Sequence, residues 1–191
     1  MPVVAIVASV GGLAAISEVL GGLPAEFRAA VIVLQHLEAG RESLLPRILA
    51  GRTPLAVRPA ASGDVLRAGH VYVAPAGRHL ALAPDRTLRL GDGPRVHYVR
   101  PAADVLLNSL AEAGAPVIAV VLTGRGEDGA RGALRVRTQG GTVLATDRGT
   151  STNFGMPGAA DDAGGVDEVL PLPRIAPRLV ALVSQLWYER E

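Results

Sequence analysis

Residues 3–12 read VVAIVASVGG, and this stretch decides the fold. The apolar run from Val3 to Ala8 predicts a short strand buried on both faces. Gly11 and Gly12 end the strand, and the apolar residues that follow them at helical spacing predict an amphipathic helix. A buried strand followed at once by a helix is the first half of a βαβ unit.

The same alternation continues along the chain. We expect strands at 30–34, 55–59, 117–122, 142–145 and 166–172, and helices at 13–20, 40–50, 103–113, 127–139 and 175–187. The stretch 71–90 differs, because its three short apolar runs are separated by turn residues and predict a small antiparallel hairpin. The sequence therefore predicts an α/β fold, a doubly wound three-layer sandwich with a mostly parallel sheet and a small antiparallel β-hairpin.

Length and composition narrow the class of protein. The 191 residues suffice for one domain with a full core, so we expect a single domain over 1–191. A formal net charge of +1 gives no field that favours nucleic acid or an anionic membrane. The absence of cysteine excludes thiol catalysis and thiolate metal sites. With no signal-peptide pattern and no apolar run near the ~20 residues that span a bilayer, we expect a cytoplasmic protein without membrane insertion.

Three of the predicted strands end in reactive side chains. Ser9 follows the first strand, His36 follows the second, and Asp128 lies in the loop after the strand at 117–122. Sites in doubly wound folds lie at the carboxyl ends of the strands, so these residues meet if their strands are neighbours. A serine is a weak nucleophile until a base takes its proton, and a third group must orient that base. The three residues together therefore predict a Ser-His-Asp triad.

Each of these residues also has a structural interpretation, and a lone histidine such as His36 is more often structural than catalytic. Ser9 could cap the following helix, and it matches the nucleophile-elbow pattern only in part because Val7 stands where that pattern has a glycine. Asp128 could be a first-turn acid that the helix dipole stabilises.

The other histidines compete with His36 for the role of base. His70 begins a strand, His79 lies in the hairpin and His97 lies in or near a loop, whereas only His36 closes an apolar parallel strand. No H-x-x-x-H or H-x-H spacing occurs, so we expect no metal site.

Residues 124–129 read GRGEDG and support a rival hypothesis. The pattern G-x-G-x-x-G after a strand and before a helix, with Asp147 at the end of the next strand, is typical of a dinucleotide-binding protein. Against it, Glu127 and Asp128 would stand beside a pyrophosphate, at a cost on the order of a kcal/mol or more each. The nucleotide hypothesis stays open on these grounds alone.

The chain also resembles a known family, the catalytic domain of CheB, the bacterial chemotaxis protein-glutamate methylesterase. The resemblance covers Val3 to about Val183. It rests on six short motifs in one order: Ala8-Ser9-Val10-Gly11-Gly12, Gln35-His36, Val73-Ala74-Pro75, Arg100-Pro101-Ala102-Ala103-Asp104-Val105-Leu106, Leu122-Thr123-Gly124 with Gly126 and Asp128-Gly129, and Phe154-Gly155-Met156-Pro157.

The resemblance implies a role for each triad residue. It makes Ser9 the nucleophile, His36 the base and Asp128 the orienting acid. The implied activity is hydrolysis of glutamate γ-methyl esters on chemoreceptor helices, with deamidation of receptor glutamines in some members and with no metal or cofactor. The implied partner is a methylated chemoreceptor or a similar helical protein.

The sequence departs from the family pattern at the rim of the site. Val10 stands where a small hydroxyl residue or alanine is usual, Arg125 where methionine is common and Glu127 where asparagine is common. If the oxyanion hole consists of the backbone N–H groups of Val10 and Arg125, it survives these changes. The Arg125 cation would then be available to an acidic substrate.

Family members typically carry an N-terminal receiver domain and a linker, which this sequence does not contain. We therefore expect either a stand-alone enzyme or a protein that works with a separate receiver-domain partner. A binding module for receptor-like helices without catalytic activity is the third hypothesis.

Overall fold

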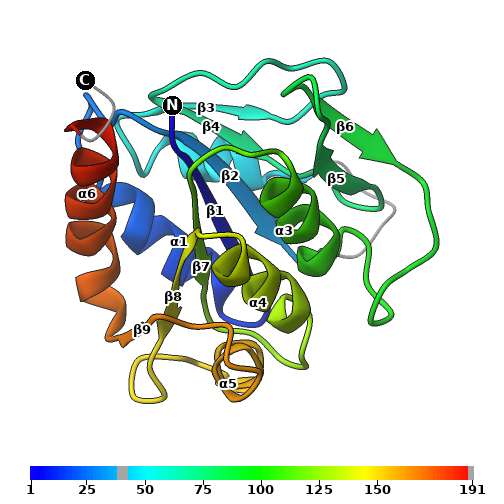
Figure 1. The fold of residues 1–191 in the computed structure, drawn as a ribbon, viewed down its shortest axis with the longest axis vertical. Coiled ribbons are helices and arrows are strands. Elements are labelled where there is room, and N and C mark those ends of the chain that lie inside the picture. Colours follow the sequence, from blue (N-terminus) through cyan, green and yellow to red (C-terminus); the bar gives the residue numbers. More distant parts are fainter. Residues whose placement is uncertain (38–42, 189–191) are drawn as a thin grey trace.

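The structure, a computed structural model, describes residues 1–37 and 43–188. Seven parallel strands form one sheet in the order β3-β4-β2-β1-β7-β8-β9, and two antiparallel strands form the hairpin β5-β6 (Figure 1). Strand β1 (Val3–Ala8) lies inside the sheet between β2 (Ala30–Gln35) and β7 (Val117–Val121). Every residue of these three strands is buried, so their sequences are continuous apolar runs rather than alternating ones.

The remaining elements complete the sheet and its two covers. The outer strands are β3 (Ala56–Pro59), β4 (His70–Val73), β8 (Thr142–Thr146) and β9 (Glu168–Leu170), and the hairpin strands are β5 (His79–Leu82) and β6 (Leu88–Gly91). The helices are α1 (Gly12–Gly21), α2 (Leu45–Ala50), α3 (Ala103–Glu112), α4 (Ala130–Thr138), α5 (Gly155–Asp162) and α6 (Leu172–Tyr188).

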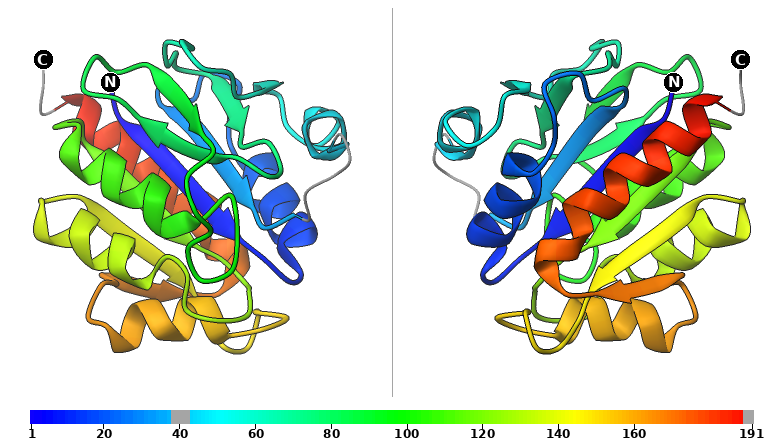
Figure 2. Two further views of the ribbon diagram at one scale, coloured as in Figure 1. Left: turned by 90° about the vertical axis from the view of Figure 1, so that its right-hand side faces the viewer. Right: turned by 90° about the vertical axis from the view of Figure 1, so that its left-hand side faces the viewer.

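Two hydrophobic clusters lie on opposite faces of the sheet. On one face, the strands bury their side chains against α3, α4, α5 and the hairpin. On the other face, they pack against α1, α2 and α6. Figure 2 shows α6 (red) and the helices α3 and α4 (green) on either side of the strands. This arrangement confirms the doubly wound, three-layer α/β fold.

β1 and β7 are neighbouring strands at the centre of the sheet, and the chain leaves them toward opposite faces of the sheet. Helix α1 follows β1 onto one face, and α4 follows β7 onto the other. The loops at the carboxyl ends of these strands therefore diverge and leave a crevice between them, which is where open α/β sheets bind their ligands.

Several element boundaries differ from the sequence prediction. The run at 71–73 belongs to β4 in the parallel sheet, so the hairpin includes only the two later runs. The predicted helix at 40–50 is observed as Leu45–Ala50, with Pro46 in its first turn, and residues 40–42 lie outside the described part of the chain. Helix α4 begins at Ala130 rather than 127, because Gly129 takes a left-handed φ of 99° just before it. The interpretation of Asp128 as a first-turn acid is therefore wrong.

Helix α5 was not predicted. Its sequence, GMPGAADD, contains two glycines and a proline and has little intrinsic helix propensity. Its buried Met156 and Ala160 pack into the core and supply the stabilisation that the local sequence lacks. Within residues 1–37 and 43–188, no helix has both the length and the apolar character that a membrane span requires.

Candidate active site

His36 and Asp128 meet at the carboxyl edge of the sheet. His36 directly follows β2, and Asp128 lies in the loop between β7 and α4. The His36 Nε2 and Asp128 Oδ2 atoms lie 2.7 Å apart, with side-chain exposures of 10% and 3%. A bond this short and this well shielded from water fixes the imidazole ring and its tautomer.

Ser9 lies beside this pair at the end of β1. The backbone N–H of His36 donates to the carbonyl of Ala8 at 3.0 Å, so Ser9 and His36 occupy adjacent positions on neighbouring strands. Ser9 is half-buried, and its Oγ makes no hydrogen bond within the described residues. Asp128 faces Nε2 of the ring, so Nδ1 is the nitrogen that remains for another partner, and no hydrogen bond joins it to Ser9 Oγ within the described residues.

Ser9 does not cap helix α1. The residue that precedes the helix is Gly11, with a left-handed φ of 78°, and no side chain caps this end. The carbonyl of Ser9 accepts hydrogen bonds from Gly12 N–H at 2.9 Å and from the side-chain amide of Gln35 at 2.7 Å. The hypothesis that Ser9 is a helix cap is therefore wrong, and its hydroxyl is left for another role.

The carboxylate of Asp128 is held in its charged form. Burial raises its pKa, but hydrogen bonds from His36 and from the backbone N–H groups of Asp104 and Ala103 outweigh burial and leave the pKa below its ordinary value. The two N–H groups lie 3.0 Å from Oδ1 and 2.6 Å from Oδ2, respectively. A charged Asp128 can stabilise an imidazolium at His36.

The lowered pKa of Asp128 predicts a pH-dependent stability. Its contribution is fully present above the unfolded-state pKa of about 4 and is lost as the pH falls through the lower folded-state pKa. We expect Asp128→Asn to reduce the free energy of unfolding at pH 7 and to reduce it much less at pH 3. Urea denaturation of both proteins at the two pH values measures this difference. An equal loss at pH 7 and pH 3 would contradict the assignment of a charged, hydrogen-bonded Asp128.

The loop after β7 packs directly against Ser9. The backbone N–H of Ser9 donates to the carbonyl of Thr123 at 2.9 Å, and Thr123 Oγ1 donates to the carbonyl of Val10 at 2.9 Å. Asn153 joins this loop, because its N–H donates to Thr123 Oγ1 and its carbonyl accepts the N–H of Gly124, both at 2.9 Å. These bonds fix the peptide groups around the Ser9 hydroxyl.

Two backbone N–H groups near Ser9 are unused. Neither the N–H of Val10 nor that of Arg125 donates to an acceptor in residues 1–37 and 43–188. Val10 directly follows Ser9, and Arg125 directly follows Gly124, which packs against Ser9. Their N–H groups are therefore the candidate donors for an oxyanion hole at Ser9.

Gly124 has no room for a side chain. A Cβ at this position would overlap the Sδ of Met156 and would lie 2.8 Å from the Cβ of Ser9. We expect Gly124→Ala to cost about 1–3 kcal/mol of stability through overpacking, or roughly 2–4 °C in melting temperature per kcal/mol, and to impair Ser9 reactivity as well. Calorimetry and labelling of Ser9 measure the two effects. Gly91→Ala is the matched control, because a Cβ there meets nothing within 4 Å; equal behaviour of the two variants would contradict this account.

Three polar residues that hold the backbone around the candidate site were not predicted from single residues. These are Gln35, which binds the carbonyl of Ser9, Asp104, which holds the N-terminus of α4, and Asn153, which holds the Thr123 loop. Gln35 and Asp104 stand in motifs that carry the family resemblance, and Asn153 directly precedes another. Those motifs were the only sequence signal that could have found them.

An open groove runs beside Ser9. It has a volume of about 840 Å³, and its lining includes Ser9, Leu13, Ala14 and Ile48. Leu13 and Ile48 are exposed, as is Val10 next to Ser9. A largely apolar groove beside the candidate nucleophile suits the apolar face of a protein segment better than a small polar ligand.

One group of residues in the described ranges has the spacing of a cation site. His97, Asp104 and Asp128 each have a potential ligand atom within 4.8 Å of the others. All four carboxylate oxygens, however, already accept hydrogen bonds from backbone N–H groups or face an imidazole. A cation would have to displace these donors, which counts against a cation at this position. The expectation of a metal-free site remains a prediction.

The hydrogen bonds at the start of α4 count against the dinucleotide hypothesis. The first N–H groups of α4, where a pyrophosphate would bind, include those of Gly129 and Gly132, which donate to Asp104 Oδ1 at 3.1 and 2.7 Å. Asp147 is engaged as well, since its Oδ1 accepts bonds from the N–H and the hydroxyl of Thr150. An internal carboxylate thus occupies the position that the nucleotide would need.

Comparison with known proteins agrees with this geometry. The sequence profile described as CheB methylesterase matches residues 4–179. The chain is 44% identical, over 95% of its length, to a protein-glutamate methylesterase/protein-glutamine glutaminase of Moorella thermoacetica, and 41% identical, over 96%, to the protein-glutamate methylesterase FrzG of Myxococcus xanthus. It spans about half of these relatives, 44% and 55% of their respective lengths.

A solved structure shows the same fold. The CheB methylesterase catalytic domain of Thermotoga maritima superimposes with a TM-score of 0.89 at 37% sequence identity, covering 94% of this chain and 97% of that one. The profile match, the sequence identity and the shared fold agree, and the chain belongs to the CheB methylesterase family.

Proposed function

We propose that this chain hydrolyses glutamate γ-methyl esters on chemoreceptor-like helical proteins through a Ser9-His36-Asp128 triad. The observation that carries the proposal is the shielded 2.7 Å contact between His36 and Asp128, next to a serine that caps no helix. The relatives named protein-glutamate methylesterase/protein-glutamine glutaminase support the same reaction class. Deamidation of glutamine is a second acyl transfer that the same residues can perform.

The first half of the reaction is acylation of Ser9. Its Oγ attacks the ester carbonyl carbon while Nδ1 of His36 takes the proton, and the N–H groups of Val10 and Arg125 bind the oxyanion. The tetrahedral intermediate collapses with cleavage of the C–OCH₃ bond. His36 returns its proton to the leaving oxygen, and methanol departs.

The second half is hydrolysis of the acyl-enzyme. Water attacks the Ser9 ester and gives a proton to His36, which then protonates the Ser9 oxygen as the glutamate carboxylic acid leaves. Asp128 keeps the ring oriented and stabilises the imidazolium in both halves. With a glutamine substrate, ammonia replaces methanol as the leaving group.

The surroundings of Ser9 suit a protein substrate. The apolar groove can accept one face of a receptor-like helix, and the exposed Arg125 adds a cation next to Gly124, the residue that packs against Ser9. A glutamate-rich segment next to the ester would pair with this cation.

The test is methanol release from a methylated chemoreceptor, followed as a time course with a protein-free control. The proposal requires release that depends on enzyme concentration and saturates with receptor. Binding of the receptor without methanol release, by a folded protein, would instead support a binding module. A rise in melting temperature with millimolar dinucleotide would revive the nucleotide hypothesis.

A further inference from the structure

A second imidazole, that of His97, approaches the site from the loop before α3. Val96 and Val99 exchange backbone hydrogen bonds at 3.1 and 3.0 Å and so close a tight turn around His97 and Tyr98. Both turn residues have a left-handed backbone, with φ values of 51° and 65°, which is uncommon for residues other than glycine. Tyr98 is 92% exposed, whereas the His97 side chain is only 24% exposed and faces other residues.

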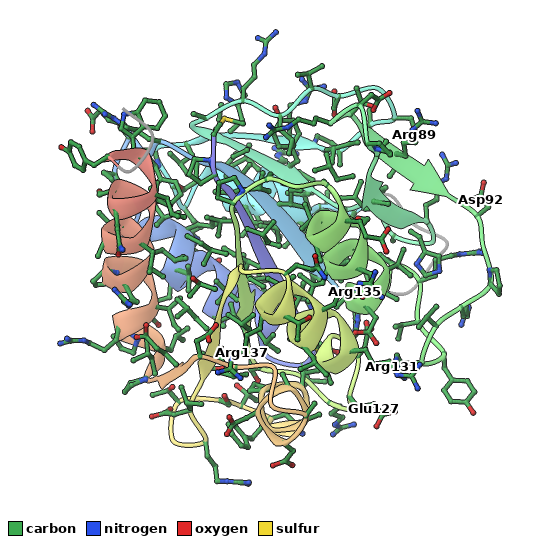
Figure 3. The ribbon with its side chains drawn as sticks, in the orientation of Figure 1. Arg89, Asp92, Glu127, Arg131, Arg135 and Arg137 are labelled. Carbon is green, nitrogen blue, oxygen red and sulfur yellow. The ribbon has the colours of Figure 1, made fainter. Side chains whose placement is uncertain are left out.

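Both ring nitrogens of His97 face carboxylates. Nε2 lies 2.9 Å from Oδ2 of Asp104, and Nδ1 lies 3.4 Å from Oε1 of Glu127. The Glu127 side chain is 72% exposed, and Figure 3 shows it at the outer rim of the molecule, on the segment that leads into α4. The Asp104 side chain is only 5% exposed, so water competes far less for this contact, which is the stronger of the two.

Asp104 and Asp128 cap each other's helices. Asp104, in the first turn of α3, uses Oδ1 to accept the N–H groups of Gly129 and Gly132 at the start of α4. Asp128, just before α4, accepts the N–H groups of Ala103 and Asp104 at the start of α3. Asp128 is therefore held on both sides, through its own carboxylate and through Gly129, the next residue, which the Asp104 carboxylate binds.

We propose that His97 is a positioning residue for the reaction. Its Nε2–H holds the Asp104 carboxylate, Asp104 holds the start of α4, and the start of α4 sets the Asp128 oxygen that binds His36. The inference rests on the proposed function, because it assigns His97 to the support of the same triad. Its chemistry is the hydrogen bond from Nε2 to Asp104, not proton transfer to the substrate.

Two conservative variants separate this role from a simple role in the turn. His97→Gln places an amide nitrogen close to the position of Nε2 and keeps a donor for Asp104. His97→Asn is too short to reach Asp104, but asparagine tolerates a left-handed backbone better than most residues and so favours the turn. A role in positioning predicts that Gln preserves activity better than Asn, whereas a role only in the turn predicts the reverse order.

The readout is the rate constant for labelling of Ser9 by a fluorophosphonate, which requires the triad but no receptor. We expect His97→Asn to lower it roughly tenfold without unfolding the protein, because a small displacement of catalytic groups has effects of this size or larger. His97→Gln should retain most of the rate. His70→Asn is the matched control, since His70 hydrogen-bonds the carbonyl of Ala68 and stacks on Tyr72 at the start of β4, with no hydrogen bond or ring contact to the candidate site within the described residues.

The outcomes are distinct. Slow labelling of the Asn variant with rescue by Gln supports the positioning role. Equal rates for wild type and both variants, or a faster Asn than Gln variant, overturn it. If wild-type Ser9 itself is not labelled, the proposed function fails, and this result is separate from any effect of His97.

Discussion

Ser9→Ala is expected to lower the rate of methanol release from a methylated chemoreceptor by roughly a thousandfold or more. The hydroxyl oxygen forms the acyl-enzyme bond, and alanine offers no replacement for it. The fold should survive, because Ser9 Oγ makes no hydrogen bond in the described part of the chain and the contacts of Ser9 run through its backbone. The residual rate would come from the oxyanion donors alone.

The control for Ser9→Ala is the same substitution at a serine outside the candidate site. Ser184→Ala is suitable, because Ser184 is an exposed residue of α6 and none of the candidate site residues lies on this helix. Its rate should equal that of wild type. Similar rates for Ser9→Ala and Ser184→Ala would remove Ser9 from the mechanism.

Asp128→Asn is expected to reduce methanol release by about 10³–10⁴-fold, as neutral replacements of a triad acid do. Both oxygens of Asp128 accept backbone N–H groups, and Oδ2 also binds His36. An asparagine must turn its NH₂ toward one of these donors, which misplaces the ring or leaves a buried donor unpaired. The loss should lie in kcat, since Asp128 is buried and does not line the apolar groove beside Ser9.

Asp92→Asn is the control variant for Asp128→Asn. Asp92 pairs with Arg78 at the surface and is 70% exposed, so its variant should keep the wild-type rate. Circular dichroism of Asp128→Asn must show a folded protein for the comparison to hold. A folded Asp128→Asn with wild-type kcat would mean that His36 is oriented by another group.

Much of the fold could be predicted because its central strands are buried on both faces. Continuous apolar runs such as Val3–Ala8 and Val117–Val121 are typical of strands that lie inside a parallel sheet covered by helices. The prediction failed where stability comes from tertiary contacts. Helix α5 contains Gly155, Pro157 and Gly158 and is held by its packing, and β4 joins the sheet through its pairing with β2.

The candidate site residues could be selected from the sequence because each follows a predicted strand, and the structure shows that the three strands are neighbours. The register of β1 with β2 places Ala8 opposite Gln35, which brings Ser9 next to His36. The supporting groups could not be derived in this way. Asp104 and Asn153 act through contacts with loops 25 and 30 residues away in sequence, and such contacts depend on how α3 and α5 pack.

The most direct test of the central claim, that Ser9 is an activated nucleophile, is peptide mapping by mass spectrometry after reaction with a fluorophosphonate. The account predicts a single covalent adduct on the peptide that contains Ser9, and its loss in His36→Gln at the same concentration and time. A folded wild-type protein that carries no adduct, or carries it on another residue, would contradict the account.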